Sequence, residues 1–226
     1  MKRLFVVLSL CLASSAYANV LYSNGPVDGT TGAYFLDFRT VSDQFNPSGS
    51  TMTGFDIALW VSPGSVPVQF DWRVGTLPFD GSLGSATAII GRGVTASLLC
   101  TSGSSYNGGI CGRNNGFDIY WVSVTTSAIT VGNGDWLTLG NGGDSSGLGI
   151  AWDVNSGPSP AAYSSNGAIP SESFDITGQS AVLEPGTSML LAGGFLGLAA
   201  LLRRKRIAMR ASNRSSQRCI SETVHY

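Results

Sequence analysis

Apolar side chains alternate with polar or small ones along several short stretches of this 226-residue chain. Successive side chains of a β-strand point to opposite faces, so this period of two predicts strands with one buried face. No stretch of about ten residues between Asn19 and Leu183 has the three-to-four spacing of an amphipathic helix. The alternating stretches are residues 55–61, 66–74, 117–121 and 148–154, with shorter ones at 136–139 and 174–176.

Turn-forming residues separate these stretches. The chain contains 30 Gly and 9 Pro, and clusters of Gly, Asn, Asp, Pro and Ser favour tight turns. Many short strands joined by turns predict an all-β fold, an antiparallel β-sandwich that is jelly-roll-like, over residues 19–182. The predicted turns are residues 62–64, 79–81, 132–134 and 141–143.

The first eighteen residues have the pattern of a secretory signal peptide. Lys2 and Arg3 precede the apolar run 4–12, and Ala16 and Ala18 stand where a signal peptidase needs small residues. We therefore expect cleavage after Ala18 and a mature chain that starts at Asn19. A buried N-terminal helix is the alternative interpretation, but it leaves the alanine pattern unexplained.

A second apolar run, residues 187–202, lies near the other end and precedes four cations, Arg203, Arg204, Lys205 and Arg206. The run rises about 24 Å as a helix, against roughly 30 Å of hydrocarbon, and the long basic side chains can reach the interface. We expect one C-terminal transmembrane helix with residues 207–226 as a disordered cytoplasmic tail, since basic clusters stay inside. A helix buried in a soluble core is the alternative.

The same C-terminal residues resemble the PEP-CTERM sorting signal of exported proteins from Gram-negative bacteria. Glu184 and Pro185 match the sorting motif of that family, although Leu183 stands where the family usually has its first Pro, and a basic cluster follows an apolar run. The resemblance covers residues 183–206 and implies that an exosortase, a membrane-embedded transpeptidase, processes the chain. Short motifs within 41–176 also resemble PEP-CTERM proteins whose extracellular domain has no assigned activity.

Two of the four cysteines lie in the predicted exported domain. Cys11 falls in the signal peptide and Cys219 in the tail, which leaves Cys100 and Cys111 as a pair. An isolated pair in an oxidising compartment predicts a disulfide. Zinc is the alternative, but a zinc site needs further Cys or His ligands, and the single histidine is His225.

Charge and residue content narrow the functions of the domain. Residues 19–183 contain four Arg, no Lys, eleven Asp and one Glu, a net charge of about −8 that disfavours nucleic acid as a partner. Histidine-dependent catalysis is excluded there because His225 lies outside. A glycoside hydrolase needs two carboxylates, and Glu172 with Asp153 or Asp135 is the pair that spacing leaves open.

Two candidate binding features remain. Asp135 and Asp144 lie in Gly- and Asn-rich segments and are weak calcium candidates, although such residues are also ordinary turn material. Trp60 stands on the opposite phase from Ile57 and Leu59, which predicts an exposed aromatic ring suited to stacking on sugars.

The sequence therefore predicts a non-enzymatic surface or extracellular-matrix protein, tethered to the membrane facing the periplasm and then sorted. A carbohydrate-binding, lectin-like module with extracellular polysaccharide as its partner is the alternative, and a glycoside hydrolase is the third.

Overall fold

The computed structural model describes residues 19–113, 116–179 and 194. The chain divides between Ala181 and Val182 into two compact units. All fifteen strands of the described residues belong to the first unit, and the account below concerns that unit alone.

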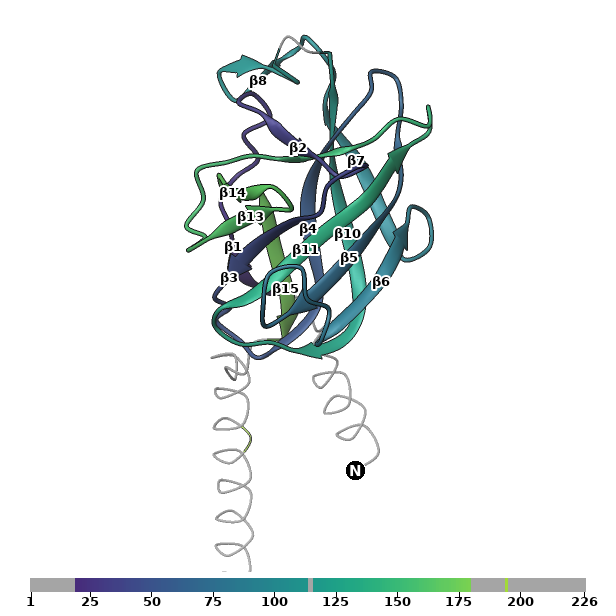
Figure 1. The fold of residues 1–226 in the computed structure, drawn as a ribbon. Coiled ribbons are helices and arrows are strands. Elements are labelled where there is room, and N and C mark those ends of the chain that lie inside the picture. The colour runs from purple at the N-terminus through teal and green to yellow at the C-terminus, as the bar shows by residue number, and fades with distance from the viewer. Residues whose placement is uncertain (1–18, 114–115, 180–193, 195–226) are drawn as a thin grey trace, which may run out of the picture. The chain divides into compact units, whose positions relative to one another are not determined.

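Two antiparallel sheets and a short ribbon make up this unit (Figure 1). Sheet A has seven strands, in which β12 and β2 extend the sheet beside β4. They are β1 (Asn19–Ser23), β15 (Phe174–Gln179), β4 (Thr51–Val61), β10 (Asp118–Thr130), β7 (Val94–Cys100), β12 (Ala151–Asp153) and β2 (Ala33–Phe35).

Sheet B has six strands, and a separate ribbon of two strands lies near β2 at one end of the unit (Figure 1). The strands of sheet B, in spatial order, are β14 (Gly167–Ile169), β13 (Ala162–Ser164), β3 (Val41–Phe45), β11 (Asp135–Asp144), β5 (Pro67–Gly75) and β6 (Gly84–Ile89). The ribbon pairs β8 (Ser105–Tyr106) with β9 (Gly109–Ile110).

The main apolar core lies between the two sheets. Phe55 of β4 contacts Trp72 of β5 with ring centroids 5.7 Å apart, and Phe45 of β3 contacts Phe174 of β15 at 6.4 Å. These pairs join sheet A to sheet B, and all four side chains are buried. The two sheets therefore form a sandwich whose interior is filled by the alternate residues of each strand.

The chain crosses repeatedly between the sheets. It passes from β3 in sheet B to β4 in sheet A and back to β5, and it crosses again at each step from β10 to β13. Strands that are consecutive in sequence are therefore often separated in space, which alternation alone does not predict.

The expected all-β fold is confirmed, and the strongest alternating stretches lie on strands β4, β5, β10, β11, β12 and β15. The predicted turn at 141–143 is wrong, because these residues lie within β11. Asn141 has a φ of 49° there, and the pairing of β11 with β5 shifts between Gly140 and Gly143. The glycines and asparagine thus make a bulge inside a strand, not a hairpin.

The structure corrects one part of the predicted fold class, the C-terminal transmembrane helix. Within residues 19–113, 116–179 and 194, no helix is long and apolar enough to cross a membrane. Apart from Gly194, the run 187–202 lies outside the described residues. Its sixteen residues would rise about 24 Å, which falls short of the roughly 30 Å of a hydrocarbon core.

The core makes a direct prediction for Phe174. Its ring is fully buried against Tyr22, Phe45 and Trp152, with centroids 5.7, 6.4 and 5.6 Å away. Phe174→Ala is expected to lower the free energy of unfolding by about 3–5 kcal/mol, because the cavity remains among rigid neighbours. Urea denaturation measures this loss. Val20→Ala, at a side chain 54% exposed on the adjacent strand, should change it by less than about 0.5 kcal/mol.

Candidate functional site

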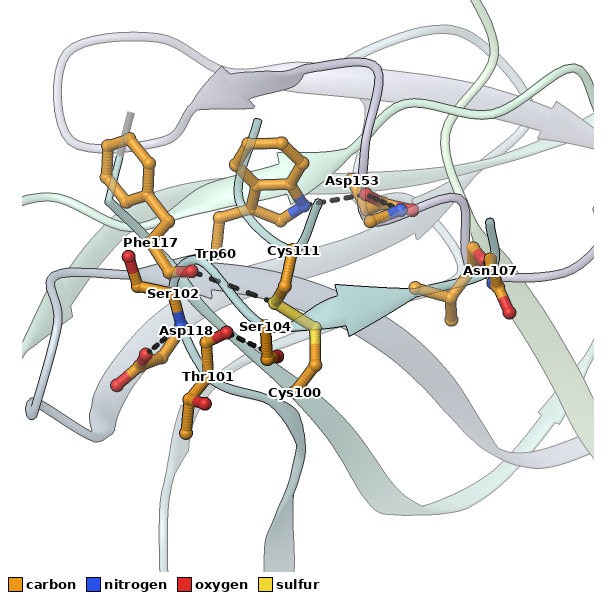
Figure 2. Close-up of a disulfide and its surroundings, with 12 residues drawn as sticks. Trp60, Cys100, Thr101, Ser102, Ser104, Asn107, Cys111, Phe117, Asp118 and Asp153 are labelled. Carbon is orange, nitrogen blue, oxygen red and sulfur yellow. Dashed lines mark hydrogen bonds between the residues drawn. A yellow bond between two sulfur atoms is a disulfide. The ribbon is translucent and has the colours of Figure 1, made fainter. Parts of the chain in front are cut away.

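The predicted disulfide is present between Cys100 at the end of β7 and Cys111 just after β9. It closes a lobe, residues 100–111, that contains the β8–β9 ribbon (Figure 2). The Cys111 sulfur also lies 3.9 Å from the carbonyl oxygen of Phe117. This is a packing contact, because a disulfide sulfur carries no hydrogen to donate.

The lobe is fastened to the segment that precedes β2. The Asn107 side-chain amide donates to the carbonyl of Val27 at 2.7 Å, and the backbone N–H of Gly112 donates to Gly29 at 3.0 Å. Gly29 has a φ of 65°, and a Cβ there would lie 2.9 Å from the Tyr106 ring. Only glycine accommodates both the left-handed backbone and this close approach.

Together the lobe and this segment cover the outer face of sheet A. Beneath them lies a second apolar cluster, separate from the main core. It contains Val27, Ala58, Trp60, Cys100, Cys111, Ile119 and Ala151. Strand β4 therefore buries both faces, with Ile57 and Leu59 in the sandwich and Ala58 and Trp60 in the outer cluster.

The prediction that Trp60 is exposed is wrong. Its side chain is only 3% exposed, and its indole N–H donates to Asp153 at 2.6 Å (Figure 2). Trp60 does stand on the opposite phase from Ile57 and Leu59, but that phase faces the second cluster and not solvent. The sequence did contain a signal, since residues 57–61 are apolar on both phases, as in a strand buried on both sides.

Trp60 begins a row of aromatic rings that reaches the surface. Its ring lies 5.9 Å from Phe117, Phe117 lies 5.9 Å from Phe35, and Phe35 stacks on Phe38 at 6.0 Å. Phe35 and Phe117 are half-buried, whereas Phe38 is 65% exposed. We call Trp60, Phe117, Phe35 and Phe38 the aromatic strip; its residues come from three separate parts of the chain that the fold brings together.

A hollow of about 140 Å³ opens within the aromatic strip. Three of its rings, Phe35, Trp60 and Phe117, line the hollow together with Arg113 and the small residues Gly32, Ala33 and Ala151. The outer cluster is thus incompletely filled on the side where the strip lies, and the opening carries a positive charge on an otherwise acidic domain.

Asp153 connects the segment before β2 to Trp60 of β4. Its buried carboxyl accepts the backbone N–H groups of Asp28 at 2.9 Å and Gly29 at 3.0 Å, besides the indole of Trp60. Burial raises the pKa of Asp153 to about 7, and these hydrogen bonds to the ionised form only partly oppose that effect.

A second group of acids is buried near the start of β15. Asp43 of β3 accepts hydrogen bonds from the Asn24 amide at 3.0 Å, the Glu172 backbone N–H at 2.7 Å and the Ser159 hydroxyl. Burial raises the pKa of Asp43, against the lowering effect of the hydrogen bonds from Glu172 and Ser159. Both side-chain oxygens of Glu172 are buried, and neither accepts a hydrogen bond from any described residue.

Burial, and then the Asp43 charge, raises the pKa of Glu172 well above its usual range. Burial at this position therefore favours the neutral form of the Glu172 carboxyl group. Glu172, Asp43 and Asp153 are all fully buried. The pair that spacing left open for glycoside hydrolysis, Glu172 with Asp153, is thus inaccessible to a substrate in this structure.

A groove of about 730 Å³ is lined by few side chains that could take part in catalysis. Its walls come from residues 25–28 and 154–158, with Thr31, Asn107 and Pro170. Asp28 is the titratable side chain among these lining residues.

Both calcium candidates accept hydrogen bonds from backbone N–H groups of other residues. Asp135 accepts the N–H of Gly132 at 2.7 Å, and Asp144 accepts the N–H groups of Ser62, Ser146 and Leu148. The two residues lie at opposite ends of β11. No group of three or more His, Cys, Asp or Glu side chains is placed to hold a metal ion among the residues that the structure describes.

The remaining predicted site residues lie outside the described part of the chain. These are Ala16 and Ala18 of the signal peptide, Glu184 and Pro185 of the sorting motif, and the cluster Arg203, Arg204, Lys205 and Arg206.

Comparison with known proteins assigns neither a family nor a function to this chain. No family model, no curated protein and no solved structure matches this chain.

The disulfide predicts a measurable stabilisation. Replacing both Cys100 and Cys111 by Ser is expected to lower the free energy of unfolding by roughly 2–3 kcal/mol, because the unfolded chain loses a short covalent loop. Chemical denaturation of the oxidised protein and the double variant checks this. A matched control is Ser104→Ala in the same lobe, which keeps the bond. Equal stability of all three proteins would contradict the prediction.

The buried Asp153 predicts a pH-dependent stability. Between about pH 4 and 7 the folded protein keeps a proton that the unfolded chain has released, so the free energy of unfolding falls as the pH rises through this window. For Asp153 alone the fall from pH 4.5 to 7 is about 3 kcal/mol. Asp153→Asn should reduce the slope by the Asp153 contribution, as followed by urea denaturation at each pH. Ser104→Ala, which removes no titratable group, is the control and should leave the slope unchanged.

Proposed function

We propose that this protein is exported and acts outside the cytoplasm as a non-enzymatic domain of the cell surface or extracellular matrix. The observation that carries the proposal is the disulfide between Cys100 and Cys111. Structural disulfides form and persist in the periplasm and outside the cell, whereas cytosolic reductants keep such pairs as thiols.

The disulfide is part of the architecture and not an accidental contact. Both cysteines are buried in the outer cluster, and the lobe that they close is hydrogen-bonded to Val27 and Gly29. A reduced lobe would hold the outer face of sheet A less firmly. The domain is therefore built for a compartment in which its cysteines are oxidised.

Features at both ends of the domain support the same compartment. Every strand of the described residues lies after Ala18, so cleavage there would remove none of them. After the domain come Glu184 and Pro185, the pair that resembles a sorting motif, and an exosortase-type enzyme is the proposed partner. The polysaccharide-rich surroundings of the cell are the proposed final location.

The arrangement of acids supports a non-enzymatic role. The three carboxyl groups with the greatest burial, Asp43, Asp153 and Glu172, are hydrogen-bonded to backbone or enclosed by protein. General acid–base catalysis needs such groups within reach of a substrate proton. In this domain their positions serve to join segments of chain.

Export can be tested in a Gram-negative host that contains an exosortase. The full chain is expected in the periplasmic, surface or extracellular fraction, with an N-terminus at Asn19 by intact mass measurement. Cys100 and Cys111 should resist alkylation until a reductant is added. Recovery of the intact 226-residue chain in the cytosol with both thiols free would overturn the proposal.

A matched pair of variants separates cleavage from expression. Ala18→Arg places a large charged side chain at the predicted cleavage position and should leave the signal peptide attached. Tyr17→Phe, one residue earlier, keeps Ala16 and Ala18 and should be processed normally. Mass measurement distinguishes the two products by the mass of residues 1–18.

A further inference from the structure

The aromatic strip has an arginine on each side, Arg113 and Arg39. Packing of the buried core does not explain why Phe38 stands exposed between them. Fully exposed aromatic rings are costly to hydrate, and Phe38 is among the most exposed apolar side chains of the described residues, together with Leu77. Unlike Leu77, Phe38 continues a row of rings that leads into a hollow.

The geometry of the rings favours a flat partner. Phe35 and Phe38 are nearly parallel, with an angle of 21° between their planes. Next to them, Phe35, Phe117 and Trp60 enclose the hollow of about 140 Å³. Ring faces of this kind pack against the apolar C–H face of a sugar ring. Because the strip is longer than one ring, it suits a chain of sugars better than a single small molecule.

The charges favour an acidic partner. The Arg113 guanidinium lines the hollow, and its Nη1 would lie 3.8 Å from a Cβ on Gly32, another lining residue. At the other end, the guanidinium carbon of Arg39 lies 5.2 Å from the centre of the Phe38 ring. Two of the four arginines between Asn19 and Leu183 thus flank one strip. A guanidinium pairs with a carboxylate through two parallel hydrogen bonds.

Three acids lie close to the strip, and each has hydrogen-bond donors of its own. Asp37 accepts the Phe38 backbone N–H, and Asp153 is buried beneath the strip and accepts the Trp60 indole N–H. Asp118 accepts the N–H groups of Gly64 and Ser102. Charges farther than about 8 Å from the strip are screened at physiological salt.

From these observations we infer that the aromatic strip binds a chain of carboxylate-bearing sugars. One sugar ring occupies the hollow with its carboxylate on Arg113, and a neighbouring ring packs on the exposed side of Phe38 beside Arg39. This inference rests on the proposed export, since it places the domain where such polysaccharides occur. It corrects the sequence-based hypothesis by replacing an exposed Trp60 with a strip in which Trp60 is the innermost ring.

The test uses the exported protein purified from its host and oligogalacturonate as the probe. Isothermal titration calorimetry should detect binding of the acidic oligomer and at least about tenfold weaker binding of its methyl ester, which keeps the rings and loses the charges. Phe38→Ala and Arg113→Gln should each raise the Kd by about tenfold or more. Both side chains are exposed, so thermal melting should show that these variants remain folded.

Two control variants match these changes elsewhere on the domain. Leu77→Ala removes an equally exposed apolar side chain, and Arg92→Gln removes an exposed arginine outside the strip. Neither should change the Kd. No binding of oligogalacturonate, equal binding of the methyl ester, or equal weakening by Arg92→Gln would overturn the inference. So would self-association that Phe38→Ala abolishes, because the strip would then bind a second copy of the chain.

These results are distinguishable from failure of the proposed function. Binding is measured on purified protein and does not depend on where the cell places it. A chain that binds oligogalacturonate but stays in the cytosol would refute the proposed export alone. An exported chain that does not bind oligogalacturonate would refute only the inference that the aromatic strip binds acidic sugars.

Discussion

The outer layer of the domain depends on one buried carboxyl group. Asp153 lies at the end of β12 and accepts hydrogen bonds from the backbone of Asp28 and Gly29 and from the indole of Trp60. These donors come from two separate parts of the chain, so a single side chain fixes the segment before β2 against β4. The lobe closed by the disulfide then binds that segment through Val27 and Gly29. Without Asp153 the segment would lose the partners for two backbone donors inside an apolar layer, which is costly.

This outer layer buries the second face of sheet A. A sandwich normally buries one face of each sheet and leaves the other in water. Here the second face of β4 and β10 is covered by the lobe and by residues 27–35, and Ala58, Trp60 and Ile119 fill the space. The cover is incomplete beside Phe35 and Phe117, where the hollow opens. The hollow and the aromatic strip are therefore a consequence of the incomplete cover on the second face of sheet A.

How much the sequence predicts follows from the same arrangement. Alternation located the long strands, because a strand with one buried face has a clear period of two, and an isolated cysteine pair located the disulfide. Trp60 was misplaced because alternation assumes that the opposite phase faces water. The fixed hydrogen bonds of Asp153 and the pairing of Glu172 with Asp43 could not be predicted, since they join residues more than 90 positions apart. No local pattern distinguishes the bulge that Asn141, Gly142 and Gly143 form within β11 from a tight turn.

The buried acids Asp43 and Glu172 extend this reasoning to the segments that pair beside Asp153. Burying acids costs free energy compared with apolar packing of the same volume, so their value does not lie in stability. Apolar side chains would tolerate a shift of one segment past another, whereas a carboxyl group that must match donors at fixed positions does not. Asp43 in β3 receives the amide of Asn24 from the residue after β1 and the N–H of Glu172 from the segment before β15. Asp43 thus specifies how three distant segments meet, because its carboxyl group must match donors at fixed positions in two of them.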